Sequence, residues 1–208
     1  MSNNHAFQVR LALGALLLIG VFSTGFLLSG SRAIGKTVSN FTLQNIDGKY
    51  VSLSDYKTAK GFIVVFTCNH CPFAKLYSGR LNALNATCKP LGVPLLAVNS
   101  MDTTVYEEEH LFDMQAKAKS EQFNFPYLQD KMQKVGKDFG ADHTPHAFVI
   151  WQENKQWRIK YSGGIDDNGA NPASATPFVA EAVDQLLQNK PVARPETRSV
   201  GCAISYRK

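Results

Sequence analysis

Two nearly continuous apolar runs predict the centre of a sheet. Residues 61–67 (GFIVVFT) and 95–100 (LLAVNS) are rich in β-branched and aromatic side chains, which is typical of strands buried on both faces. Pro72 follows the first run at a position that suits the first turn of a helix, where a missing N–H does no harm. Pro90, Gly92 and Pro94 end this helix. A strand–helix–strand unit of this kind predicts parallel pairing.

Alternating patterns predict antiparallel strands on either side of this unit. Residues 41–53 (FTLQNIDGKYVSL) read as a hairpin about Asp47-Gly48, and residues 146–163 as a second hairpin about Glu153-Asn154. The polar stretch 103–120 has a helical composition, with Glu107–Glu109 on a solvated face. A clean apolar stripe predicts a last helix from Pro177 to Leu187. The expected fold class is α/β, with a central mixed sheet flanked by helices and an N-terminal β-hairpin.

The N-terminal segment differs from the rest. Residues 11–28 form an apolar stretch without any charged residue. The length of this stretch is at the boundary between a signal-peptide core of about 15 residues and a membrane-spanning helix of about 18 or more. An uncleaved anchor, a cleaved signal and a buried soluble helix therefore stay open. We expect residues 1–32 to be a signal or anchor with a linker, and residues 33–208 to form one domain. Both leading alternatives place this domain in the cell envelope, periplasmic or otherwise extracytoplasmic, and an uncleaved segment would contact the membrane.

Composition narrows the function classes. The 208 residues are 44% hydrophobic, which excludes a disordered or collagen-like chain. The chain has 22 Lys and Arg residues and 17 Asp and Glu residues, a net charge of +5. This positive charge is small and scattered, so it does not indicate a nucleic-acid-binding surface. Four cysteines are too few for a disulfide-stapled scaffold of this length. With no Gly-rich phosphate loop, no organic cofactor is implied.

The candidate chemistry lies in Cys68-Asn69-His70-Cys71, where a buried strand meets a helix. A thiol at a helix N-terminus is favoured as thiolate, and two intervening residues let the two sulfurs form a reversible disulfide. We expect Cys68 to be the more exposed, attacking thiol and Cys71 the resolving one. A protonated His70 would stabilise the thiolate and make the Cys68–Cys71 disulfide more oxidising.

A second element is Thr144-Pro145, directly before the strand at 146–151. Proline is tolerated at the start of a strand. The order of elements predicts that this turn lies opposite the two cysteines, with its backbone free to pair with an extended substrate. A protein or a small thiol would be the redox partner.

These motifs together resemble the thioredoxin fold. More closely, VVFTCNHCPFAK, VGKDFGADHTPHAFVI and the closing SVGCAISY resemble the bacterial peroxiredoxin-like branch of the redoxin (AhpC/TSA) superfamily. The resemblance covers residues 36–208. It implies a thioredoxin-like fold, thiol–disulfide exchange at Cys68 and Cys71, and a cis-proline at Pro145. His143 stands where this family often has cysteine, and the N-terminal apolar segment is not part of the usual soluble form.

Several alternatives remain for individual residues. Peroxide reduction has weak support, because a peroxidatic site has threonine three residues before its cysteine, whereas Thr67 directly precedes Cys68. Copper delivery would use Cys68 and Cys71 with His143 or His146, although such chaperones have three residues between their cysteines. Cys88 is expected to be a buried free thiol. Cys202 is either a packed tail residue or a third redox thiol that reacts with Cys71 or Cys88.

Overall fold

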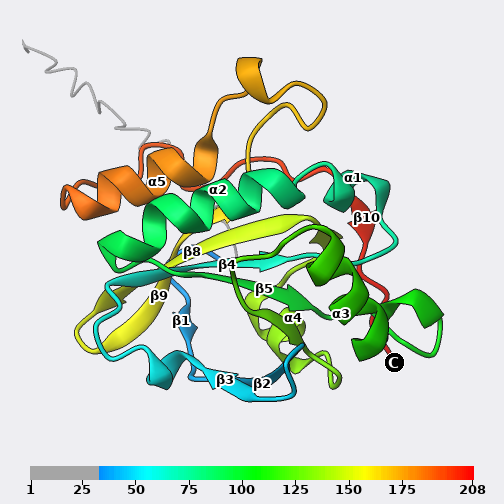
Figure 1. Ribbon diagram of the computed structural model, residues 1–208. Helices are drawn as coiled ribbons and strands as arrows, with labels where there is room; N and C mark the ends of the chain where they lie inside the picture. Colours follow the sequence, from blue (N-terminus) through cyan, green and yellow to red (C-terminus); the bar gives the residue numbers. More distant parts are fainter. Residues whose placement is uncertain (1–32) are drawn as a thin grey trace, which may run out of the picture.

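A mixed eight-stranded sheet forms the centre of the computed structural model, which describes residues 33–208 (Figure 1). The strand order is β1-β9-β8-β4-β5-β6-β2-β3, and a separate pair joins β10 to β7. The strands are β1 (Thr37–Val38), β2 (Thr42–Asn45), β3 (Tyr50–Ser52), β4 (Gly61–Phe66), β5 (Leu95–Asn99), β6 (Tyr127–Gln129), β7 (His143–Thr144), β8 (His146–Glu153), β9 (Gln156–Gly163) and β10 (Cys202–Ala203). The helices are α1 (Pro72–Lys75), α2 (Ser78–Cys88), α3 (Leu111–Ser120), α4 (Lys134–Phe139) and α5 (Phe178–Leu187).

The predicted strand–helix–strand unit is present. Strand β4 pairs in parallel with β5, and β5 pairs in parallel with β6. On the other side, β4 pairs antiparallel with β8 over all six of its residues. Both predicted hairpins, β2–β3 and β8–β9, are also confirmed. Gly48 closes the first of them with φ +83°, a left-handed conformation that glycine adopts without a steric penalty.

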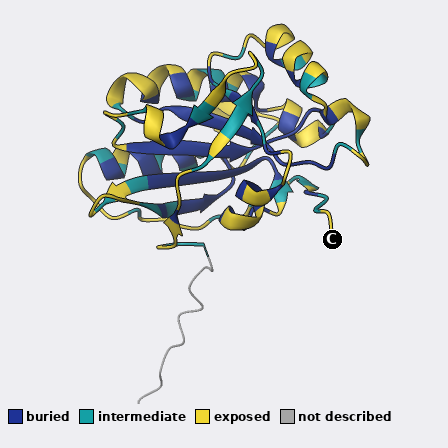
Figure 2. Ribbon diagram, turned by 90° about the horizontal axis from the view of Figure 1, so that it is seen from below, coloured by how far each residue is buried: buried dark blue, intermediate teal, exposed yellow. Residues whose placement is uncertain are grey.

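Alternate side chains of each central strand enter two separate cores. Ile63 and Val65 of β4 pack with residues from α2, α3 and α5, whereas Phe62, Val64 and Phe66 pack with residues from α4 and the C-terminal tail. In Figure 2 the central strands are buried and the outer faces of the helices are exposed. The cysteines divide between these cores: Cys88 lies in the first, and Cys68, Cys71 and Cys202 lie in or against the second.

Two helices differ from the prediction. The helix that starts at Pro72 is interrupted after Lys75, so that α1 has one turn and α2 begins at Ser78. The stretch 103–120 is helical only from Leu111, because a 3-10 turn at Glu107–Glu109 precedes α3. Within residues 33–208, no helix has the length and apolar character needed to cross a bilayer, and the apolar segment 11–28 lies outside the described residues.

Arg80 interrupts the apolar pattern of α2 because it has a buried partner. Its guanidinium pairs with Asp166 and also donates to the Asn168 carbonyl at 2.9 Å. The Tyr77 hydroxyl donates to the same carboxylate at 3.0 Å. These bonds hold the loop after β9 against α2.

Candidate active site

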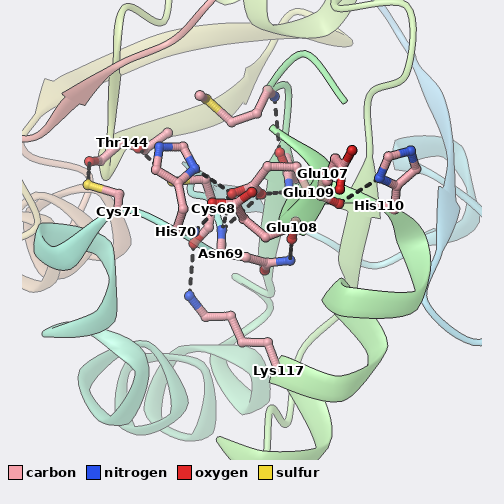
Figure 3. Close-up of polar contacts among 12 residues, drawn as sticks. Cys68, Asn69, His70, Cys71, Glu107, Glu108, Glu109, His110, Lys117 and Thr144 are labelled. Atoms are coloured by element: carbon pink, nitrogen blue, oxygen red, sulfur yellow. Dashed lines mark hydrogen bonds and ion pairs between the residues drawn. The ribbon is translucent and has the colours of Figure 1, made fainter. Parts of the chain in front are cut away.

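The two motif cysteines lie at the carboxyl end of β4 and face one residue, Thr144. The Cys68 sulfur is 3.0 Å from the Thr144 hydroxyl, and the Cys71 sulfur is 3.1 Å from the Thr144 carbonyl oxygen (Figure 3). The Thr144–Pro145 peptide bond is cis. All four cysteines of the chain are free thiols. The structure therefore brings together four residues that the sequence singles out: Cys68, Cys71, Thr144 and Pro145.

The predicted difference in exposure between the two thiols is wrong. Both Cys68 and Cys71 are 0% exposed. Burial raises the pKa of Cys68 to about 12, and the Glu109 carboxylate adds to this rise. Burial also opposes the Cys71 thiolate, but hydrogen bonds from Cys202 and the Ala74 backbone outweigh it, so the pKa of Cys71 is lowered.

The surroundings of the two thiols explain this difference. Cys71 is the N-cap of the one-turn helix α1, and after Cys202 the Ala74 backbone of that turn is the next cause that lowers the pKa of Cys71. Cys68 is three residues away, and the N–H groups of Asn69 and His70 point to Glu109 instead. Burial and the Glu109 charge therefore outweigh the Thr144 hydroxyl and the Cys71 backbone, which lower the pKa of Cys68.

Glu109 organises the loop between the cysteines. Its side chain is fully buried, and it accepts hydrogen bonds from the backbone N–H groups of Asn69 and His70, each at 2.9 Å. The His70 ring Nδ1 and the Asn99 amide also lie 2.6 Å from its oxygens. Because an ionised carboxylate only accepts hydrogen bonds, this set of donors fits a negative charge. Figure 3 shows Glu109 reaching into the loop from beside α3.

His70 lies beside Cys68 and Glu109, with a ring nitrogen within 4.8 Å of the Cys68 sulfur and of a Glu109 oxygen. Its ring stacks on Tyr106, with centroids 4.3 Å apart and planes 9° apart, and its Nδ1 faces Glu109. His70 can therefore act on the Cys68 thiol directly and through the charge of Glu109. Lys117 of α3 contributes an ammonium group, whose Nζ donates to the Cys68 carbonyl at 2.8 Å. Burial lowers the pKa of Lys117, against the opposing charges of Cys68 and Glu109.

The backbone edge at Thr144 is not free, contrary to the prediction. Strand β10 pairs antiparallel with β7, so that Cys202 lies opposite Thr144 and Ala203 opposite His143. Cys202 thus lies beside the residue that Cys71 contacts, and the two thiols interact, since each shifts the pKa of the other. Cys88 is 4% exposed and belongs to the core on the other face of the sheet, as expected for a buried free thiol.

The two histidines near Thr144 do not join the thiols. His143 Nδ1 is 2.7 Å from the Asp142 carboxylate. His146 is buried beside Ser162, and burial lowers its pKa. Among residues 33–208, one group of three or more His, Cys, Asp or Glu side chains has its ligating atoms within 4.8 Å of one another: Cys68, His70 and Glu109.

Sequence reasoning missed Glu109 and Lys117. Glu109 was expected on a solvated helix face with its two acidic neighbours, yet it is 0% exposed whereas Glu107 and Glu108 are exposed. A signal was present: the segment 100–110 follows β5, and the carboxyl ends of parallel strands β4 and β5 lie at one edge of a sheet. Polar residues soon after β5 could therefore have been placed near Cys68.

Comparisons with known proteins agree with this geometry. The thiol-disulfide oxidoreductase ResA of Bacillus cereus is 26% identical over 144 residues, 69% of this chain and 76% of that protein. A crystal structure of an uncharacterised conserved protein from Geobacillus kaustophilus is 33% identical with a TM-score of 0.76, covering 84% of this chain and 92% of that one.

The fold itself is thioredoxin-like, as expected. A putative thioredoxin from Neisseria meningitidis superposes with a TM-score of 0.56 at 20% identity, covering 74% of this chain and 92% of that one. A model of the AhpC/TSA family matches residues 34–159, which include the CxxC motif, the cis-proline and most of the sheet. Since this match spans more than half of the chain, the protein belongs to the AhpC/TSA family.

Proposed function

We propose that the protein is a thiol-disulfide oxidoreductase that exchanges disulfides through Cys68 and Cys71. One observation carries the proposal: both sulfurs contact Thr144, directly before cis-Pro145, where a mixed disulfide would form beside a strand edge. The similarity to proteins named thiol-disulfide oxidoreductase ResA supports this activity.

A disulfide of the partner accepts the electrons in this reaction. A thiolate attacks one sulfur of the partner disulfide, and the partner's other sulfur leaves as a thiol. The second cysteine then attacks the mixed disulfide, so that Cys68 and Cys71 become joined and the partner is fully reduced. Two electrons and two protons pass from the protein to the partner, and the reverse reaction oxidises the partner. A protein or a small thiol can serve as that partner.

The experiment is a glutathione redox titration of the full chain in detergent. We expect a reversible two-electron couple between roughly −120 and −270 mV, the range of thioredoxin-fold oxidoreductases. Cys68→Ser/Cys202→Ser should retain a persistent mixed disulfide with glutathione at Cys71 and lose the couple. Cys88→Ala, on the other face of the sheet, is the matched control and should titrate as the wild type does. A wild-type dithiol that never cycles would refute the proposal.

His70 should set the potential of this couple, both directly beside Cys68 and through Glu109. In His70→Gln the Glu109 carboxylate loses its ring partner, so its charge acts more strongly on the thiolates of the reduced form. We expect the reduction potential to fall by roughly 30 mV, a tenfold change in the exchange equilibrium. His110→Gln, an exposed neighbour, serves as the control. An unchanged or higher potential in His70→Gln would remove His70 from this role.

Copper delivery has less support. His143 and His146 face Asp142 and Ser162 and are absent from the cluster of ligating side chains around Cys68. Repeating the titration with one equivalent of Cu(I) separates the two functions. A redox enzyme cycles in the absence of copper, whereas a carrier would cycle poorly and hold Cu(I) tightly.

The proposal includes a position outside the cytoplasm. The uncharged residues 11–28 support it, since they suit an anchor or a signal. A reporter enzyme that is active only outside the cytoplasm, fused after Lys208, is expected to be active. An inactive but folded fusion would contradict this location.

A further inference from the structure

The C-terminal tail occupies the strand edge beside the cis-proline. Cys202 and Ala203 pair antiparallel with Thr144 and His143, and the Ile204 N–H continues the ladder by donating to the Asp142 carbonyl at 2.9 Å. Extended peptides bind other proteins by adding a strand to such an edge. The tail is therefore bound as a peptide substrate would be.

The sequence of the tail fits this position closely. A Cβ atom on Gly201 would lie 2.0 Å from the Thr144 carbonyl oxygen, so only glycine allows the backbones to approach this far. On the other side of Cys202, Ile204 is buried and the Tyr206 hydroxyl donates to the Ala141 carbonyl at 2.8 Å. Gln133 also donates to the Ser205 carbonyl at 2.6 Å. Contacts on both sides thus fix the position of Cys202.

Cys202 is placed against one particular sulfur. Cys202 lies opposite Thr144, and the carbonyl of Thr144 accepts a hydrogen bond from the Cys71 sulfur at 3.1 Å. The interaction between the two thiols raises the pKa of Cys202 and lowers that of Cys71. Burial is the largest cause of the rise at Cys202, whose pKa is about 11. Cys88 is in the opposite core and cannot reach either thiol. Of the two partners that the sequence leaves open for Cys202, the geometry selects Cys71.

We propose that Cys202 is a third redox thiol, which the tail delivers as an internal substrate to the Cys68–Cys71 disulfide. This inference rests on the proposed function and identifies a substrate of the same site. Cys202 loses its proton and its sulfur bonds to Cys71. The Cys68–Cys71 bond breaks, and Cys68 leaves with the electron pair and takes up the proton. No net oxidation occurs, because one protein disulfide replaces another.

The geometry favours Cys68 as the leaving thiol. The Thr144 hydroxyl, 3.0 Å from the Cys68 sulfur, is positioned to hydrogen-bond that sulfur as it is released. The product then has a Cys71–Cys202 disulfide that ties the tail to the site, with Cys68 as a free thiol. A partner that binds at the Thr144 edge must first displace β10.

The test uses Cys68→Ser in the full chain, treated with glutathione disulfide and then with iodoacetamide. Peptide mapping by mass spectrometry is expected to find a Cys71–Cys202 disulfide formed through a short-lived glutathione adduct at Cys71. In Cys68→Ser/Cys202→Ser this adduct should persist at least ten times longer. Cys68→Ser/Cys88→Ala is the matched control and should behave as Cys68→Ser does.

Gly201→Ala tests the position of the tail while leaving every thiol in place. Added to Cys68→Ser, it should slow closure of the Cys71–Cys202 disulfide at least tenfold, with an unchanged circular dichroism spectrum. The proposal is overturned if the adduct at Cys71 decays equally fast with and without Cys202, or if closure is no faster in the folded protein than in urea. Failure of the proposed function is distinct: the wild-type Cys68–Cys71 couple would then not cycle with glutathione.

Discussion

Cys71 will ionise far below Cys68 when the two thiols are titrated separately. The pKa of Cys68 is about 12 because the thiol is buried near the Glu109 carboxylate, whereas the pKa of Cys71 is lowered by its partners. An ordinary cysteine has a pKa of about 8.5, between those of the two thiols, so at neutral pH the thiolate fraction at Cys71 should exceed that at Cys68. The resting thiolate of the site is then the second cysteine of the motif.

The measurement is thiolate absorbance at 240 nm against pH. Cys68→Ser/Cys88→Ala keeps Cys71 and its partner Cys202, and Cys71→Ser/Cys88→Ala/Cys202→Ser keeps Cys68 alone. The first variant should gain absorbance before the second. If the variant with only Cys68 titrates first, Cys68 has the low pKa that its place in the motif predicts and the structural assignment fails.

The same shifts determine how stability depends on pH. A pKa raised in the folded state, as at Cys68, gives stability that is complete below the unfolded value near 9 and is lost as the pH rises toward about 12. Cys71 acts in the opposite sense, because its lowered pKa gives stability above that lowered value. Urea denaturation from pH 7 to pH 11 should therefore show less alkaline loss in Cys68→Ser than in the wild type.

Glu109→Ala should destabilise the protein by roughly 3–5 kcal/mol, because it leaves buried donors without an acceptor. The backbone N–H groups of Asn69 and His70 and the Asn99 amide all lose their bond to this carboxylate. Urea denaturation of the reduced protein measures the change. Glu108→Ala is the matched control, since its exposed side chain should contribute within about 0.5 kcal/mol.

A second measurement, the pKa of Cys68, separates the effect of the Glu109 charge from the effect of its hydrogen bonds. Glu109→Gln keeps the size of the side chain but removes the negative charge near Cys68, so the pKa of Cys68 should fall. Glu109 is a positioning residue, because it acts on the sulfurs through the loop and its charge. Equal stabilities for Glu109→Ala and Glu108→Ala, with an unmoved pKa at Cys68, would contradict this role.

The sequence predicts the central strands and the hairpins well, because strong local patterns determine them. Strands β4 and β5 are predicted from their apolar runs alone. The two hairpins are predicted from the alternation of their side chains and from the residues of their turns. The CxxC motif and Thr144-Pro145 were likewise found, and their proximity followed from the order of the elements. These features are each encoded within a few neighbouring residues.

The remaining features depend on contacts between distant segments. Strand β10 has two residues, too few for a pattern, and its pairing with β7 depends on a glycine that meets the Thr144 carbonyl 57 positions earlier. Glu109 resembles its exposed neighbours until the N–H groups that it binds are known. Arg80 interrupts the apolar pattern of α2, and its partner Asp166 lies 86 positions later in the chain.

The pairing of the tail with β7 also determines which partners can compete for this site. A strand of the same chain is present at an effective concentration on the order of mM, whatever the dilution of the protein. A free peptide that pairs no better than the tail must reach that concentration to occupy half of the sites. The site therefore discriminates against dilute, weakly pairing chains, and Gly201→Ala should remove this discrimination in a peptide competition assay.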